Sequence, residues 1–84
     1  MNKFLLSFEF NTDKETLEIH GDEVGLKSLC EIVNRLILNT EEGQFNHDHL
    51  MTANWGGNEL SEQNAGGNVI NHVKLFCWKG NQYK

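Results

Sequence analysis

Three histidines are the residues whose type and spacing come closest to a chemical site. His47 and His49 form an H-x-H pair, and His72 lies in a second apolar run near the end of the chain. If both segments are strands, alternate side chains point the same way, and the three imidazoles can face one another. Imidazole nitrogens about 2 Å from a common point suit zinc, copper or nickel. Facing histidines on an exposed sheet are more often ordinary surface residues, so we expect no bound metal.

The sequence lacks the motifs of hydrolytic and redox chemistry. It contains no H-E-x-x-H, G-x-S-x-G, C-x-x-C or P-loop pattern. The Gly-Gly pairs at 56–57 and 66–67 lack the strand-to-helix context that dinucleotide binding requires. We therefore expect neither an enzyme nor a cofactor. Cys30 and Cys77 are expected to be two free thiols.

Acidic residues are concentrated between residues 9 and 23. That segment holds six acids and one lysine, a net charge of −5, whereas the six acids and six bases elsewhere balance. An acidic surface repels nucleic acid and raises the rate of encounter with a basic partner. We expect no nucleic-acid binding, and we expect three acids to act as rim charges of a contact surface: Glu9, Glu18 and Glu59.

The chain opens with two runs of alternating apolar residues. Residues 4–10 place Leu6 and Phe8 on one side, and residues 16–20 place Leu17 and Ile19 on one side, with Glu18 and His20 on the other. The polar segment between the runs predicts a turn, and period-2 alternation predicts half-buried strands. The two runs therefore predict a hairpin with Leu17 and Ile19 facing the core.

A helix is expected to follow Gly21. Asp22 is suited to cap the helix, and Glu23 suits the positive end of its dipole. The next residues repeat at helical spacing and predict one apolar stripe that packs on the sheet. Its members are Leu26, Leu29, Cys30, Val33, Leu36 and Ile37. Within this stripe Cys30 is expected to be a buried hydrophobic residue, and the helix is expected to end near residues 39–43.

Two further strands are predicted over residues 47–52 and 69–78, separated by a polar loop that contains Trp55 and Leu60. With Leu50 facing the core, His47, His49 and Met51 face outward. In the second strand Val73, Leu75 and Cys77 share one side. His72, Lys74, Phe76 and Trp78 share the other.

The expected fold is α+β, a single domain over residues 1–84 with the order β-β-α-β-β. One helix packs on one face of a four-stranded, mainly antiparallel sheet, and the other face is left bare. Aromatic residues among charges on a bare face indicate a contact surface for another protein or for a second copy. The candidate partner-binding residues are Trp55, Glu59, Phe76, Trp78, His49, His72, Glu9 and Glu18.

No apolar run approaches the roughly 20 residues that span a bilayer, and the first residues do not have the pattern of a signal peptide. The sequence therefore predicts a cytoplasmic protein without membrane contact.

The segments HLMTANWGGNEL and NVINHVKLFCW resemble a bacterial family of immunity proteins from polymorphic toxin systems, immunity protein 32. The resemblance extends over most of the chain, and residues 55–60 and 71–74 are its most specific parts. It implies a small α+β protein that protects its own cell by binding and neutralising a cognate toxin. A self-associating, homodimeric module is the alternative. A metal-dependent protein using His47, His49 and His72 is a weaker one.

Overall fold

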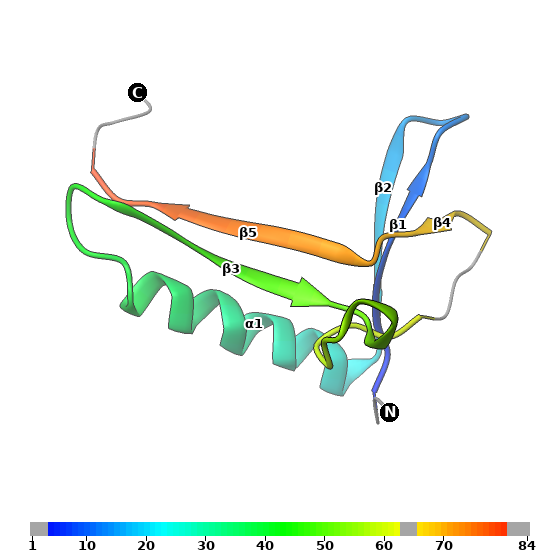
Figure 1. The fold of residues 1–84 in the computed structure, drawn as a ribbon, viewed down its shortest axis with the longest axis horizontal. Helices are drawn as coiled ribbons and strands as arrows, with labels where there is room; N and C mark the ends of the chain where they lie inside the picture. Colours follow the sequence, from blue (N-terminus) through cyan, green and yellow to red (C-terminus); the bar gives the residue numbers. More distant parts are fainter. Residues whose placement is uncertain (1–3, 63–65, 81–84) are drawn as a thin grey trace.

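The computed structural model describes residues 4–62 and 66–80. It confirms the α+β class and the single long helix (Figure 1). The elements in chain order are β1 (Leu6–Asn11), β2 (Thr16–Gly21), α1 (Glu23–Leu38), β3 (Phe45–Met51), the short 3-10 helix η1 (Ala53–Trp55), β4 (Asn68–Val69) and β5 (His72–Trp78).

The strands form two antiparallel sheets, so the expectation of one four-stranded sheet is wrong. One sheet has the order β2-β1-β4, and the other consists of β3 and β5. In Figure 1 the β1–β2 hairpin stands across one end of the β3–β5 sheet, and α1 runs along one face of that sheet.

The strand expected over residues 69–78 changes sheet at Ile70 and Asn71. The backbone N–H of Ile70 still donates to the carbonyl of Phe8 at 2.8 Å, whereas the next residues pair with β3. Two hydrogen bonds to Thr52 fix Asn71 at the point where the chain changes sheet. The Asn71 carbonyl accepts the Thr52 N–H at 3.0 Å, and its Oδ1 accepts the Thr52 hydroxyl at 2.6 Å. These tertiary hydrogen bonds divide one apolar run into two strands.

The hydrophobic core lies where α1, the base of the hairpin and the β3–β5 sheet meet. Its buried members are Leu6, Phe8, Ile32, Leu50 and Leu60, and partly buried residues packed on them include Leu29, Val73 and Leu75. At roughly 2 kcal/mol for each fully buried side chain, five such residues contribute on the order of 10 kcal/mol before chain entropy is counted. Among residues 4–62 and 66–80, no helix has the length and apolarity needed to cross a membrane.

The helix begins as predicted, but the side that packs on the core overlaps the predicted stripe only in part. Asp22 caps it, accepting the N–H of Gly25 at 2.7 Å. The buried helical residues are Gly25, Ile32 and Leu36. The expected stripe is therefore wrong at three positions, because Leu26, Cys30 and Ile37 are exposed. Cys30 and Cys77 are both free thiols, as expected, but Cys30 is not a core residue.

Gly25 explains this rotation of the helix. A Cβ at this position would lie 1.8 Å from the carbonyl oxygen of Leu5, so only glycine allows the first turn of α1 to approach β1 this closely. The N–H of Asp22 donates to the same carbonyl at 3.1 Å. The side of α1 that includes Gly25 is thereby fixed against the core.

Gly25→Ala is expected to destabilise the protein, although alanine in a helix interior is ordinarily about 1 kcal/mol more favourable than glycine. The added methyl forces α1 away from β1, and overpacking of this kind costs about 1–3 kcal/mol. Urea denaturation measures the change. Val24→Ala, at the exposed neighbouring position, is the control and should change the free energy of unfolding by less than about 0.5 kcal/mol. A Gly25→Ala protein at least as stable as the wild type contradicts the assigned contact.

The hairpin also differs from its predicted arrangement. Leu17 and Ile19 share a face with Phe8, because Ile19 is opposite Phe8 and Leu17 is opposite Phe10. Both are nevertheless exposed, since the hairpin projects beyond the elements that cover its base (Figure 1). Their predicted place in the core is therefore wrong.

Candidate functional site

β3 and β5 direct alternate side chains to opposite sides of their sheet. On the side that meets α1, Leu50 is 1% exposed, and Val73 and Leu75 pack against the core. This confirms the predicted alternation of both strands. The register Phe45↔Trp78, His47↔Phe76, His49↔Lys74 and Met51↔His72 places these eight residues on the other side. We call them, together with Trp55, the aromatic face.

The rings of the aromatic face contact one another along the sheet. Phe45 stacks on Trp78 with ring centroids 4.6 Å apart. A second series runs from Phe76 to His47 at 5.2 Å, then to His49 at 4.9 Å. From His49 the series continues to His72, with ring centroids 5.0 Å apart. It ends at Trp55, whose ring centroid lies 6.0 Å from that of His72. The strand register therefore gathers rings from distant parts of the sequence onto one surface.

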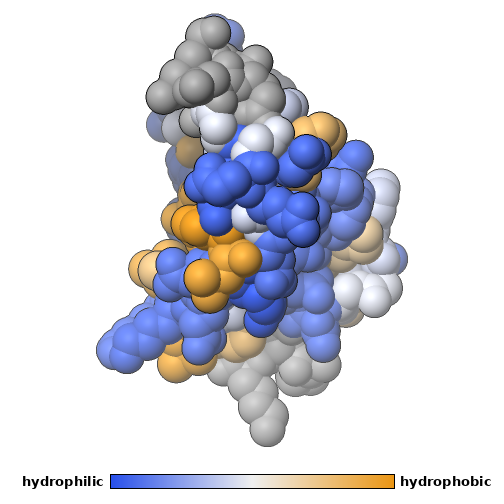
Figure 2. Space-filling view, turned by 90° about the vertical axis from the view of Figure 1, so that its left-hand side faces the viewer, coloured by the Kyte–Doolittle hydropathy of each residue, from blue (hydrophilic) through white to orange (hydrophobic). Residues whose placement is uncertain are grey.

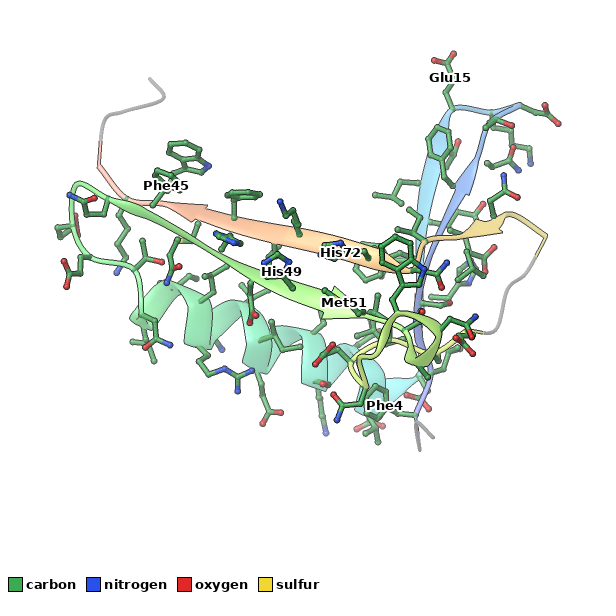
Figure 3. The ribbon with its side chains drawn as sticks, in the orientation of Figure 1. Phe4, Glu15, Phe45, His49, Met51 and His72 are labelled. Atoms are coloured by element: carbon green, nitrogen blue, oxygen red, sulfur yellow. The ribbon has the colours of Figure 1, made fainter. Side chains whose placement is uncertain are left out.

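This surface is largely open to solvent. The exposed fractions are 53% for Phe45, 58% for Trp55, 45% for Phe76 and 44% for Trp78. Figure 3 shows Phe45 projecting from the side of the sheet opposite α1, and Figure 2 shows hydrophobic residues exposed between hydrophilic ones at the end where α1 stops and β3 begins. Contiguous exposed apolar side chains are typical of interaction surfaces, which makes this face the candidate site.

Two histidines in the middle of the aromatic face share a hydrogen bond. Nδ1 of His49 lies 2.7 Å from Nε2 of His72, and one ring nitrogen must donate while the other accepts. The bond fixes both rings relative to each other. Within residues 4–62 and 66–80, the histidines His47, His49 and His72 do not belong to any group of three close metal-ligating side chains.

The segment Trp55-Gly56-Gly57-Asn58-Glu59-Leu60 holds the tryptophan at the edge of the aromatic face. Gly56 ends η1 with a φ of 86°, a conformation that favours glycine. Gly57 lies so close to Met51 that a Cβ would be 2.6 Å from its carbonyl oxygen. Glu59 accepts the N–H of Met51 at 2.9 Å, and Leu60 is buried. Glu59 therefore positions the loop, and this local contact explains its place in the segment.

Five of the eight predicted partner-binding residues lie on the aromatic face: Trp55, His49, His72, Phe76 and Trp78. Glu59 lies in the adjoining loop, and the other two are on the hairpin, where Glu18 is partly exposed and Glu9 is only 2% exposed. Phe45 and His47 were not among the predicted contacts. Both face the same side of β3 as His49, because they lie two and four residues before it. Extending the predicted strand back by two residues would have included Phe45.

The acidic segment extends over the hairpin from Glu9 on β1 to Glu23 at the start of α1. Asp13 and Glu15 are exposed in its turn, and Figure 3 shows Glu15 at the tip, well away from α1. Asp22 and Glu23 are exposed where the hairpin joins α1. Negative charge is therefore concentrated on an element adjoining the aromatic face, where it can attract a basic partner before contact.

The fold and this surface define a small α+β protein with one uncovered, ring-rich sheet face. The chain belongs to the immunity protein 32 family, whose model matches residues 16–73, more than half of its length. The matched range includes the segment of residues 55–60, β3 and the first part of β5. Comparison with curated proteins and comparison with solved structures each gave no match.

Proposed function

We propose that this protein is an immunity protein that binds and neutralises a cognate bacterial toxin domain through direct protein contact. Membership of the immunity protein 32 family supports the class of activity. The exposed aromatic face, with four large aromatic side chains between 44% and 58% exposed, supports binding through this side of the molecule. Neutralisation by occupying a toxin's surface needs no catalytic step and no cofactor. We place the complex in the bacterial cytoplasm.

The proposed contact surface has two parts, which are aromatic side chains that anchor the toxin and acidic side chains that attract it. Trp55, Phe76 and Trp78 are the anchors, because large rigid rings lose little conformational entropy on binding and bury much area. Exposed acids of the hairpin turn raise the association rate with a basic toxin surface and are expected to add less to the final affinity. High salt should therefore slow association more than it speeds dissociation.

Co-expression in a bacterium tests the function. A cognate toxin domain is expressed with and without the chain, and growth is recorded. We expect growth to be restored by the chain and purified toxin to be retained on the tagged chain. A catalytically inactive toxin domain should be retained equally well, since neutralisation acts through binding. Failure to restore growth, with both proteins present in soluble form, contradicts the proposal.

A second copy of the chain is the alternative occupant of the aromatic face, because stacked rings on a flat sheet can pair across a two-fold axis. The solution mass of the isolated protein separates the two ideas. A monomer that forms a complex only with the toxin supports the proposal. A dimer that dissociates when Trp78 is changed to alanine supports self-association.

A further inference from the structure

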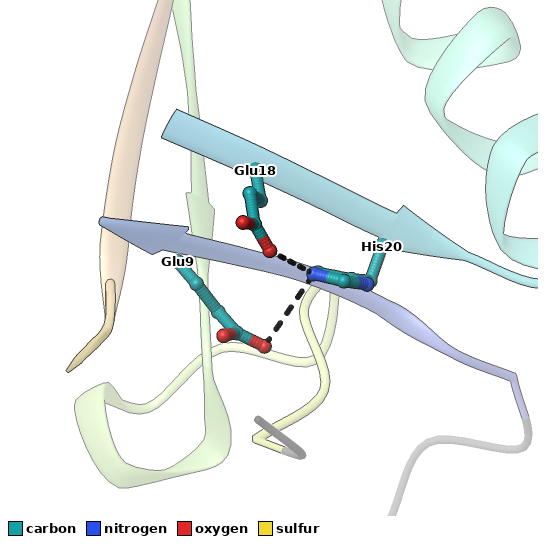
Figure 4. Close-up of side chains that lie close together, drawn as sticks. All are labelled: Glu9, Glu18 and His20. Atoms are coloured by element: carbon teal, nitrogen blue, oxygen red, sulfur yellow. Dashed lines mark hydrogen bonds and ion pairs between the residues drawn. The ribbon is translucent and has the colours of Figure 1, made fainter. Parts of the chain in front are cut away.

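Three side chains that could ligate a metal meet on the β1–β2 hairpin, away from the aromatic face. Glu9 on β1 is directly opposite Glu18 on β2, and His20 follows two residues later on the same side of β2. Nε2 of His20 lies 2.8 Å from Oε1 of Glu18 and 3.8 Å from Oε2 of Glu9 (Figure 4). One ligating atom from each residue lies within 4.8 Å of the other two.

Glu9 is held in a fixed orientation. Its side chain is 2% exposed, and its Oε1 accepts the N–H of Gly67 at 3.0 Å. A Cβ at Gly67 would lie 3.1 Å from that oxygen, so glycine allows the backbone to approach the carboxylate closely. The other oxygen, Oε2, faces His20. Hydrogen bonds that orient a ligating carboxylate in this way are typical of metal sites.

The arrangement brings like charges together. Two carboxylates at directly opposite positions of an antiparallel pair destabilise the sheet, and burial of Glu9 raises the cost because a buried charge requires compensation. A divalent cation between the three side chains would offset the repulsion between the two carboxylates.

Ser7 provides an independent indication. Its side chain is 1% exposed, and its Oγ has no hydrogen-bond partner in the described part of the chain. Ser7 is directly opposite His20 and shares the side of β1 that includes Glu9, so its side chain is the cross-strand neighbour of the His20 ring. Buried hydroxyls almost always have a partner. A water in the fourth position of a metal ion held by three protein ligands would supply one.

We propose that Glu9, Glu18 and His20 bind one first-row divalent metal ion, with Zn²⁺ as the typical occupant. The ligating atoms are Oε2 of Glu9, Oε1 of Glu18 and Nε2 of His20. One imidazole and two carboxylates suit zinc, and a tetrahedral site with bonds of about 2.1 Å has ligand atoms roughly 3.4 Å apart. The 3.8 Å separation between His20 Nε2 and Glu9 Oε2 is close to that value, and the ion would take the place of the 2.8 Å hydrogen bond between His20 and Glu18. The site joins β1 to β2 and is independent of toxin binding.

Zinc titration of the chelator-treated full chain, followed by calorimetry, tests the site. Glu18→Gln and His20→Gln remove one ligand each at partly exposed positions, so both variants should stay folded. We expect one equivalent of zinc to bind the wild type and the affinity to fall at least about tenfold in each variant. Circular dichroism confirms that the variants are folded, and a cobalt-loaded sample should show the visible absorption of a four-coordinate ion.

His49→Gln is the matched control, because His49 shares a hydrogen bond with His72 on the β3–β5 sheet and does not belong to the cluster on the hairpin. This variant should retain the wild-type equivalent of zinc with an affinity changed less than twofold. Loss of zinc binding in His49→Gln with retention in His20→Gln would overturn the proposal. Absence of zinc binding by the wild type at millimolar zinc would overturn it as well.

Discussion

Replacing Phe76 or Trp78 with alanine is expected to weaken toxin binding at least about 30-fold, which corresponds to the roughly 2 kcal/mol lost when an aromatic hot spot is truncated. Both side chains are nearly half exposed on the aromatic face, so their removal opens no large cavity in the free protein. Calorimetric titration with the toxin domain measures the affinity, and a thermal melt of each variant measures its stability. The loss of affinity should come with a preserved melt.

Val24→Ala is the matched control for this prediction. Val24 is exposed on α1, which covers the opposite side of the β3–β5 sheet (Figure 1). Its truncation should change toxin affinity less than about twofold, because it lies outside the proposed contact. Equal losses of toxin affinity in Val24→Ala and Phe76→Ala would contradict binding through the aromatic face. Loss of both binding and folding in Trp78→Ala would assign that tryptophan to stability.

Leu50→Asp is expected to unfold the domain. Leu50 is 1% exposed at the contact between β3 and the core, and an unpaired charge buried there costs several kcal/mol. A chain of 84 residues has a total stability of only about 4–13 kcal/mol at 0.05–0.15 kcal/mol per residue. Circular dichroism should show no cooperative melt.

The same substitution on the other side of β3 provides the control. His47 is exposed on the aromatic face, and His47→Asp should reduce stability by less than about 1 kcal/mol. A cooperatively melting Leu50→Asp protein, or unfolding caused equally by His47→Asp, would show that the two sides of β3 have been assigned wrongly.

The strands that form the aromatic face could be predicted from the sequence, because one buried leucine sets the parity of a whole strand. With Leu50 facing the core, His47 and His49 must face outward. In β5, Val73 and Leu75 face the core, so Phe76 and Trp78 must face outward. The division into two sheets could not be predicted. It depends on Asn71 and Thr52, whose hydrogen bonds join segments far apart in the chain.

The helix shows a second limit of pattern analysis. α1 carries apolar residues outside the predicted stripe, including Val24, Ile32 and Leu38, so spacing alone does not identify the buried side. The close contact between Gly25 and the Leu5 carbonyl selects the side with Ile32 and leaves Cys30 exposed. A glycine contributes nothing to an apolar pattern, although here it fixes the packing.

The two candidate sites also differ in how far the sequence reveals them. The aromatic residues of β5 follow one another at period 2 and form a visible pattern. The cluster of Glu9, Glu18 and His20 requires the hairpin register, because its ligands come from two strands. The sequence shows only that Glu18 and His20 are two residues apart and therefore on the same side of β2. Whether they form a cluster depends on Glu9, which the hairpin register places opposite Glu18.

Fluorine NMR of protein labelled with fluorotryptophan tests the central claim most directly, because the chain has two tryptophans and both Trp55 and Trp78 belong to the aromatic face. The free protein should give two resonances that are accessible to a soluble paramagnetic quencher. On saturation with the toxin domain, we expect both resonances to shift and both to lose that accessibility. A stable complex in which both resonances keep their positions and remain accessible would contradict binding through the aromatic face.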